Sequence, residues 1–362
     1  MGNESDKLTV VDEIKGRLEL TENDLDIVIR KSDGLPTYHL AHAVDDHFMH
    51  TTHVIRGEEW LPSLPIHVEL FTTLGFDLPK YAHVATVMKI DEENGTRRKL
   101  SKRKDKEAAV SYFLEYGYPK NGFLEYLLTL SNSNYEAWRD ENPTADKYDF
   151  MLSFDKMGVD GALFDVSKID NICKDRLSRM NKEEISSETL KWANEYDSEL
   201  KDIINSDYDY FKEIMNIERE IEKPRKDYTK YADIKDTILF FYENRYNQLL
   251  TSNELPFNPN ISKEDTITVL KTFLEKNRLD LNEQDWFANL KEIGTSVGFA
   301  ANNKEYKANK EAYKGHIGDV AQIIRISLTT KAQSPNLYNI LQILGKETYT
   351  NRINKVIDLL NN

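Results

Sequence analysis

The sequence predicts an α/β region in the first third of the chain, followed by a region built of helices. A strand–helix–strand pattern supports the first part: HVIRG (53–57) and HVATVM (83–88) have the character of buried strands and flank a helical stretch, IHVELFTTLGF (66–76). Beyond about residue 106 apolar residues recur at helical spacing, and no β-hairpin pattern follows residue 165. We therefore expect one small sheet and a long helical remainder.

The composition excludes several classes of protein. A length of 362 residues suggests two to four domains, and 48 Lys and Arg against 62 Asp and Glu give a net charge of −14, which argues against general adhesion to polyanions. Cys173 is the only cysteine, so an internal disulfide and a cysteine zinc site are excluded. No apolar run is long enough to span a membrane, and no signal peptide is evident. We expect a cytoplasmic protein.

The first elements are predicted to be strands. LTVVDEI (8–14), GRLEL (16–20) and DLDIVIR (24–30) alternate or cluster β-branched and aliphatic residues, with turn chemistry between them. Asp, Gly and Pro in residues 32–36 predict a loop, and residues 37–49 can form a helix.

The central pattern has the length of a βαβ unit. Ser63 can cap the helix, Pro65 fits its first turn, and Gly75 is placed to end it. Because such crossovers join parallel strands, we expect ligands beyond the carboxyl ends of the strands. Arg56 ends the first strand, and a basic run follows the second.

That basic run, RRKLSKRKDK (97–106), holds seven basic residues and one acid. Such a run is usually a solvated loop. Here KLSKR (99–103) places a serine between two lysines after a strand, which suits a loop whose ammonium groups close over a triphosphate.

KLSKR resembles the Lys-Met-Ser-Lys-Ser signature of class I aminoacyl-tRNA synthetases, in the form common among glutamate enzymes. Further stretches resemble the bacterial glutamyl-tRNA synthetases in the same order along the chain. These stretches are residues 32–49, 52–76, 81–90, 118–130, 163–180 and 334–347. Glutamine enzymes with a similar catalytic core read the anticodon with β-barrels, so the helical second half favours glutamate.

The resemblance implies the second half of a Rossmann-like class I catalytic domain, followed by helical stem-contact and anticodon-binding domains. The expected segments are the tail of the acceptor-binding insertion (1–35), the half catalytic domain (36–92), the lysine loop with the stem-contact region (93–175), and two anticodon-binding helical domains (176–262 and 263–362).

The resemblance also implies roles for individual residues. Tyr38, His42 and Arg56 would form the glutamate pocket, although the family often has asparagine at the position of His42. A guanidinium can grip a carboxylate in two places. Tyr38 could equally be a packed aromatic residue, and Arg56 a paired structural one. Glu59 and Trp60 would flank the adenosine of ATP, with Glu58 a solvated neighbour.

Lys99, Ser101 and Lys102 would be the catalytic loop residues, with the two lysines also contacting the phosphates of ATP and Lys102 stabilising transition-state charge. Arg225 and Lys226 are candidates for tRNA contact in an apparent helix start, although a solvated helix start explains them equally well.

Two further patterns are interpreted as non-functional. Five histidines between residues 39 and 53, with Asp45 and Asp46, scatter over several helical faces, so we expect no protein-bound metal. Gly315–Asp319 imitates the family's His-Ile-Gly-His signature but follows the lysine loop, and we interpret it as a helix junction.

The family's own His-Ile-Gly-His segment and first βαβ half are absent from the sequence. We therefore expect the C-terminal part of a glutamate–tRNA ligase, which joins glutamate to tRNA through glutamyl-adenylate with ATP as substrate and Mg²⁺ on its phosphates. Alone, it should be inactive, monomeric and able to bind tRNA. The alternative is a non-catalytic tRNA-binding module or a split-gene subunit.

Overall fold

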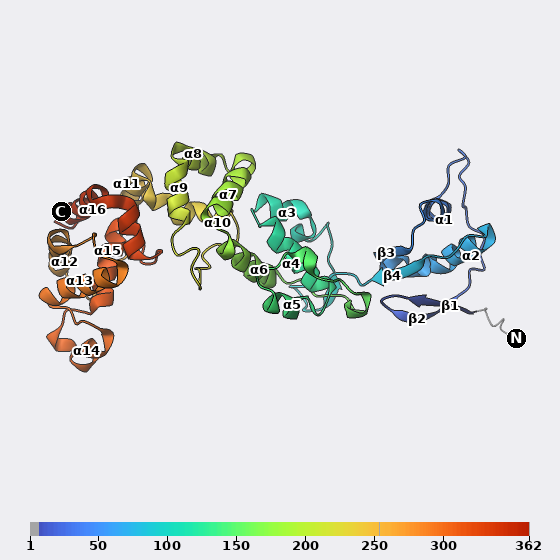
Figure 1. Ribbon diagram of the computed structural model, residues 1–362, viewed down its shortest axis with the longest axis horizontal. Helices are drawn as coiled ribbons and strands as arrows, with labels where there is room; N and C mark the ends of the chain where they lie inside the picture. Colours follow the sequence, from blue (N-terminus) through green and yellow to red (C-terminus); the bar gives the residue numbers. More distant parts are fainter. Residues whose placement is uncertain (1–6, 253, 362) are drawn as a thin grey trace. The chain divides into compact units, whose positions relative to one another are not determined.

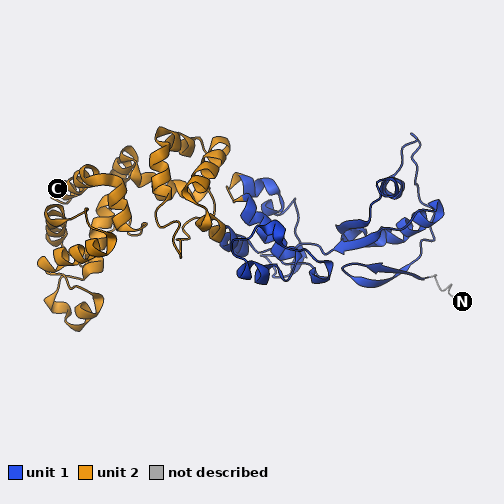
Figure 2. Ribbon diagram, in the orientation of Figure 1, with its two compact units in different colours: residues 1–114, 120–173 blue, residues 115–119, 174–362 orange. Residues whose placement is uncertain are grey.

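The computed structural model describes residues 7–252 and 254–361. Two compact units divide the chain: residues 1–114 with 120–173 form the first, and residues 115–119 with 174–362 form the second (Figure 2). No helix within the described ranges is long and apolar enough to cross a membrane.

A four-stranded sheet in the order β2-β1-β4-β3 begins the first unit (Figure 1). Strands β1 (Lys7–Asp12) and β2 (Gly16–Thr21) pair antiparallel through a tight turn at Gly16, where φ is 73°. Strands β3 (His53–Gly57) and β4 (Lys80–Val84) are parallel, with Arg56 opposite His83. A single parallel pair, Asp12 with Tyr81, joins β1 to β4. This junction brings the end of β1 beside the centre of the βαβ unit.

Helices α1 (Tyr38–Phe48) and α2 (Leu64–Leu74) pack against each other beside this sheet. The sequence predicted both: Pro65 lies in the first turn of α2, and Gly75 ends it in the left-handed conformation with φ 68°. A 3₁₀ helix, Glu58–Ser63, links β3 to α2. The predicted βαβ unit is confirmed as β3, α2 and β4.

Two predicted strands were placed wrongly. Residues 24–30 form no strand, and only an isolated bridge between Arg30 and Pro36 occurs there; Leu25 and Val28 are more than two-thirds exposed. The apolar pattern had no neighbouring strand to pair with. The predicted strand 83–88 is two elements, because β4 ends at Val84 and β5 (Met88–Ile90) forms a hairpin with β6 (Arg97–Lys99).

Short helices complete the first unit: α3 (Val110–Glu115), α4 (Lys120–Ser131), α5 (Tyr135–Glu141) and the start of α6 (Val166–Arg179). Cys173 on α6 is fully buried, and burial raises the pKa of its thiol to about 12.

The described part of the second unit is helical, as predicted. Its helices are α7 (Lys182–Tyr196), α8 (Ser198–Ser206), α9 (Tyr208–Met215), α10 (Ala232–Ile238), α11 (Glu243–Ser252), α12 (Lys263–Lys276), α13 (Glu283–Ser296), α14 (Asn303–Ala308), α15 (Ile317–Thr329) and α16 (Leu337–Asn361). One continuous apolar cluster runs through these helices, α14 excepted. A kink at Gly345, with φ 72°, divides α16.

Arg352 on α16 is a buried cation at the centre of this unit. Its guanidinium donates to the carbonyls of Phe240 (2.7 Å) and Leu328 (2.8 Å) and to the carboxylate of Glu243 (3.0 Å). The side chain therefore ties α16 to two backbone segments whose carbonyls would otherwise lack a donor.

The imitation signature at Gly315–Asp319 is the start of α15, which confirms its interpretation as a helix junction. His316 is the N-cap, its Nδ1 accepts from the amide of Gly318 (2.8 Å), and Asp319 accepts from the amide of His316 (2.8 Å).

Candidate functional site

Arg56 is held at the carboxyl end of β3 by two histidines. Its Nε donates to Nε2 of His83 on β4 at 3.0 Å, and its Nη1 donates to Nδ1 of His67 on α2 at 2.9 Å. Nη2 is buried and has no hydrogen-bond partner among the described residues. An unsatisfied buried donor is costly, so this atom marks a place where a ligand would be stabilised.

The partners of His83 determine its tautomer. Since arginine can only donate, Nε2 of His83 must accept, and the proton lies on Nδ1, which donates to Oδ2 of Asp12 at 2.6 Å. Burial lowers the pKa of His83 despite this carboxylate, and the charge of Arg56 lowers it further. The ring is therefore neutral near pH 7.

The same argument applies to His67. Its Nδ1 accepts from Arg56, so its Nε2 carries the proton and donates to Nδ1 of His39 at 2.9 Å. Burial, with the charge of Arg56, lowers the pKa of His67 to about 3. Arg56 thus contacts two neutral acceptors.

Aromatic rings line the same site. The guanidinium of Arg56 lies 4.9 Å from the ring centre of Tyr81 and 5.8 Å from that of Trp60. Tyr38, half exposed at the start of α1, lies 4.6 Å from Trp60 and stacks on His42 at 5.8 Å between ring centres. The structure therefore gathers four of the predicted ligand-binding residues, Tyr38, His42, Arg56 and Trp60.

Both ring nitrogens of His42 are already engaged. Nδ1 lies 2.5 Å from Asp46, and Nε2 lies 3.1 Å from the hydroxyl of Tyr81. Burial lowers the pKa of His42, so the neutral ring donates to Asp46 and accepts from Tyr81. His42 offers a ligand its ring surface rather than a free polar atom.

The two glutamates after β3 have different surroundings. Glu58, expected to be solvated, instead accepts from Lys15 (2.7 Å) and from the amide of Thr86 (2.9 Å), which lowers its pKa and ties the end of β3 to the segment after β4. Glu59 is exposed, and its carboxylate folds over Gly57, where any Cβ would overlap it. Gly57 therefore permits this position of Glu59.

The basic run forms the end of the β5–β6 hairpin and the turn after it. Arg98 pairs with Asp91 and Asp105, and Asp105 also accepts from the amide of Ser101 at 2.8 Å. Lys99 and Lys102 are exposed, and no ion pair in the described residues engages either of them. One cation of the run thus supports the loop, while the two predicted catalytic lysines are free to contact a ligand.

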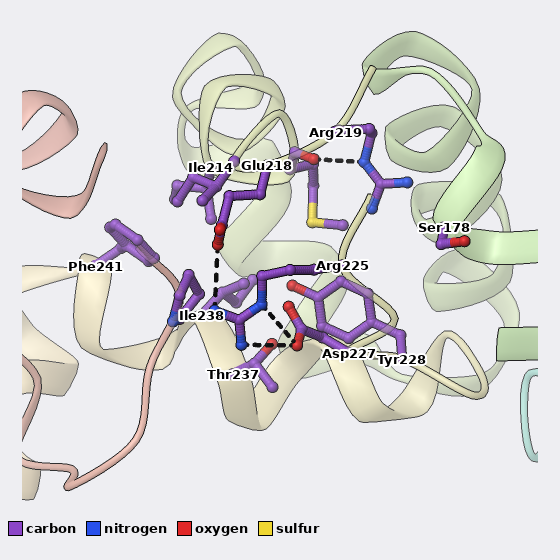
Figure 3. Close-up of a pocket in the computed structure, with 13 residues that line it drawn as sticks. Ser178, Ile214, Glu218, Arg219, Arg225, Asp227, Tyr228, Thr237, Ile238 and Phe241 are labelled. Carbon is purple, nitrogen blue, oxygen red and sulfur yellow. Dashed lines mark hydrogen bonds and ion pairs between the residues drawn. The ribbon is translucent and has the colours of Figure 1, made fainter. Parts of the chain in front are cut away.

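Arg225 and Lys226 lie in the second unit, in a non-helical segment before α10 rather than in the predicted helix start. Figure 3 shows Arg225 between Glu218 and Asp227, which it contacts at 3.2 and 2.8 Å. Lys226 pairs with Asp175 at 2.7 Å and is half exposed. Both cations are partly neutralised by the chain's own acids.

Sequence reasoning missed Asp12, His67 and His83. Two of them could have been found from the sequence. Asp12 ends the apolar strand LTVVD and His83 lies inside the apolar strand YAHV, and a buried polar residue requires a partner. The parallel pairing that brings Asp12 and His83 to Arg56 could not be predicted from their spacing in the sequence.

Comparisons with known proteins agree with this arrangement. The family described as tRNA synthetases class I (E and Q), catalytic domain, matches residues 1–147, and the family described as anticodon binding domain matches residues 187–357. Residues 1–147 thus match a class I tRNA synthetase catalytic family, and residues 187–357 match an anticodon-binding family. The predicted fold class, a Rossmann-like class I catalytic segment followed by helical domains, is confirmed.

Relatives of this chain include the glutamate–tRNA ligases of Clostridium beijerinckii, 46% identical over 99% of the chain, and Acetivibrio thermocellus, 43% identical over 99%. The chain spans 64% of the length of each. A glutamate–tRNA synthetase structure from Elizabethkingia anophelis has a TM-score of 0.72 at 24% identity, covering 98% of this chain and 66% of its own, and supports the fold.

Proposed function

We propose that this chain supplies part of the active site, and the tRNA-binding helices, of a glutamate–tRNA ligase. Its relatives with this name match it along nearly its whole length, while it spans 64% of theirs. The activity is therefore proposed for the chain acting with the segment that those relatives have in addition. The alternative, a tRNA-binding module without catalysis, is the other outcome of the test below.

The observation that carries the proposal is the buried, unpartnered Nη2 of Arg56. Neutral acceptors on Nε and Nη1 orient the guanidinium without cancelling its charge, so a substrate carboxylate can supply the missing acceptor. The two-point grip expected from sequence is restricted, because Nε and one Nη1 proton are already used. Tyr38 and His42 would form the adjacent wall of the glutamate pocket.

ATP would bind between Glu59 and Trp60 on one side and the lysine loop on the other. Lys99 and Lys102 would neutralise its phosphates, with Lys102 stabilising the charge that develops as pyrophosphate leaves, and Ser101 would keep the loop's turn. Mg²⁺ would arrive on the phosphates, since no three metal-ligating side chains gather within the described ranges.

The helical second unit would bind tRNA, as its match to an anticodon-binding family supports. Contacts to phosphates should be salt-sensitive, and Lys226, half exposed, is a better candidate than the twice-paired Arg225. We propose a cytoplasmic monomer.

The decisive experiment is tRNA- and glutamate-dependent ATP–pyrophosphate exchange. It would be measured on this chain alone and after addition of a separately produced N-terminal segment of the Clostridium beijerinckii relative. Exchange in the mixture alone supports the proposal. No exchange in either, with tRNA binding intact, would support the non-catalytic module.

A further inference from the structure

We infer that Asp12 and His83 are positioning residues of the Arg56 site. Asp12 fixes the tautomer of His83, and His83 fixes the guanidinium so that Nη2 faces an anionic ligand. This inference rests on the proposed function, in which that ligand is the carboxylate of glutamate. Asp12, His83 and Arg56 come from β1, β4 and β3. β3 and β4 pair directly, and the parallel pair of Asp12 with Tyr81 joins β1 to them.

Every oxygen of Asp12 faces a donor. Oδ1 accepts from the amides of Ile14 (3.0 Å) and Lys15 (2.9 Å), while Oδ2 accepts from the amide of His83 (3.1 Å) and from its ring (2.6 Å). The side chain is fully buried, so this carboxylate has no position for a proton. Although burial acts to raise it, these hydrogen bonds hold the pKa of Asp12 below its usual value.

A fixed Asp12 carboxylate permits one state of His83. The alternative tautomer would direct an Nε2–H at the Nε–H of Arg56, and the doubly protonated ring would do the same. With the proton on Nδ1, the lone pair of Nε2 faces Arg56, which orients the guanidinium plane. Asp12 therefore acts on Arg56 through the ring, across two hydrogen bonds of 2.6 and 3.0 Å.

The relay also preserves the charge of Arg56. No carboxylate among the described residues forms an ion pair with its guanidinium, and the atoms that accept from Nε and Nη1 belong to neutral rings. A carboxylate in direct contact would compete with an incoming anion for the same donors. Asp12 instead orients the cation at a distance, which leaves Nη2 charged and unpartnered.

The first test needs no substrate. In the full chain with ¹⁵N-labelled histidine, identified by comparison with His83→Gln, we expect His83 at pH 7.5 to carry its proton on Nδ1. In Asp12→Asn, the amide orientation that keeps the bonds from the amides of Ile14 and Lys15 turns its NH₂ towards Nδ1 of His83, so the Nε2–H tautomer should appear. A wild-type ring protonated on Nε2, singly or doubly, would overturn the inference.

The second test is kinetic and uses the exchange mixture described above. Asp12→Asn should raise KM for glutamate about tenfold or more, while KM for ATP stays within about twofold. Glu13→Gln, which alters the neighbouring acid that pairs with Lys80, is the matched control and should change neither. Equal changes in KM for glutamate and KM for ATP would mean that Asp12 only stabilises the fold, and would overturn the inference.

A third test uses two variants of His83 and does not depend on whether Asp12→Asn folds. His83→Gln keeps a neutral acceptor for Arg56, whereas His83→Leu removes it, so KM for glutamate should rise much more in the leucine variant at comparable thermal stability. Equal KM values would contradict the relay. If the wild-type mixture shows no exchange, the proposed function fails, and the tautomer measurement alone still decides whether Asp12 sets the state of His83.

Discussion

Arg98 donates to both carboxylate oxygens of Asp105, each at 2.7 Å, across the turn that carries the exposed Lys102. Asp105 is buried and also accepts from the amide of Ser101, while its own amide donates to the carbonyl of Ser101 at 2.8 Å. This pair closes the turn from Ser101 to Asp105. The orientation of Lys102 therefore depends on a residue that does not itself reach the surface.

Asp105→Asn should loosen the lysine loop. The amide cannot accept both bonds from Arg98 together with the one from Ser101, so we expect kcat for exchange to fall about tenfold with little change in KM for glutamate. Asp91→Asn, which removes one bond to Arg98, is the control and should have a smaller effect. An equal loss in both variants would mean that the turn does not depend on Asp105.

Lys102→Ala should reduce kcat far more than KM. If Lys102 acts on charge that develops in the transition state, its loss should cost about 100-fold in kcat. Lys104→Ala removes an exposed lysine from the same turn and should cost less than about threefold. Similar losses for the two variants would indicate a general electrostatic effect of the basic run.

Arg352→Met should destabilise the second unit by about 3 kcal/mol, because two buried carbonyls lose their donor and Glu243 loses one of its two cationic partners. Lys355→Met, which removes the other cation beside Glu243 at a half-exposed position, should cost less than about 1 kcal/mol. Urea unfolding followed by far-ultraviolet circular dichroism would measure both. A cost for Arg352→Met as small as that of the control would contradict the buried anchor.

Acid should destabilise the first unit through His67. Its folded pKa is about 3 and its unfolded pKa about 6.5, so the unfolded chain binds the extra proton between these values. Stability is then lost as the pH falls from about 6.5 towards 3, by at most about 1.4 kcal/mol per pH unit for this one group.

His67→Gln cannot take up that proton and should flatten the dependence of stability on pH. Urea unfolding at pH 7.5, 6 and 5 measures the slope. His53→Gln, at an exposed position of β3, is the control and should keep the wild-type slope. An unchanged slope in His67→Gln would assign the acid sensitivity to other groups.

Lys226→Ala should weaken tRNA binding a few-fold at low salt and reduce the dependence of log affinity on log salt by about one. Arg225→Ala should change the salt dependence less, since its charge is shared with Glu218 and Asp227. Filter binding at several salt concentrations would compare them. Identical salt dependence in the wild type and Lys226→Ala would remove Lys226 from the contacts.

The sequence predicted those helices and strands that are marked by residues at their own ends or by their own apolar pattern. Pro65 and Gly75 bounded α2, and the apolar run of HVIRG predicted β3. The prediction of a strand over residues 24–30 was wrong, because a pattern of apolar residues forms a strand only where a neighbouring strand can pair with it. Residues 24–30 have no such neighbour. The site was predicted in part. Arg56 was found from its place at the end of a strand, whereas His83 reaches it across 27 positions of sequence and Asp12 reaches His83 across 71.

Cys173, the single cysteine, is fully buried with a raised thiol pKa of about 12, which leaves the folded chain without a reactive thiol. A cysteine introduced at the surface, for example at Lys104 in the turn of the lysine loop, would therefore react alone with a maleimide dye. Closure of the loop over a nucleotide could therefore be followed by the fluorescence of a dye at this one position, without first removing a natural cysteine.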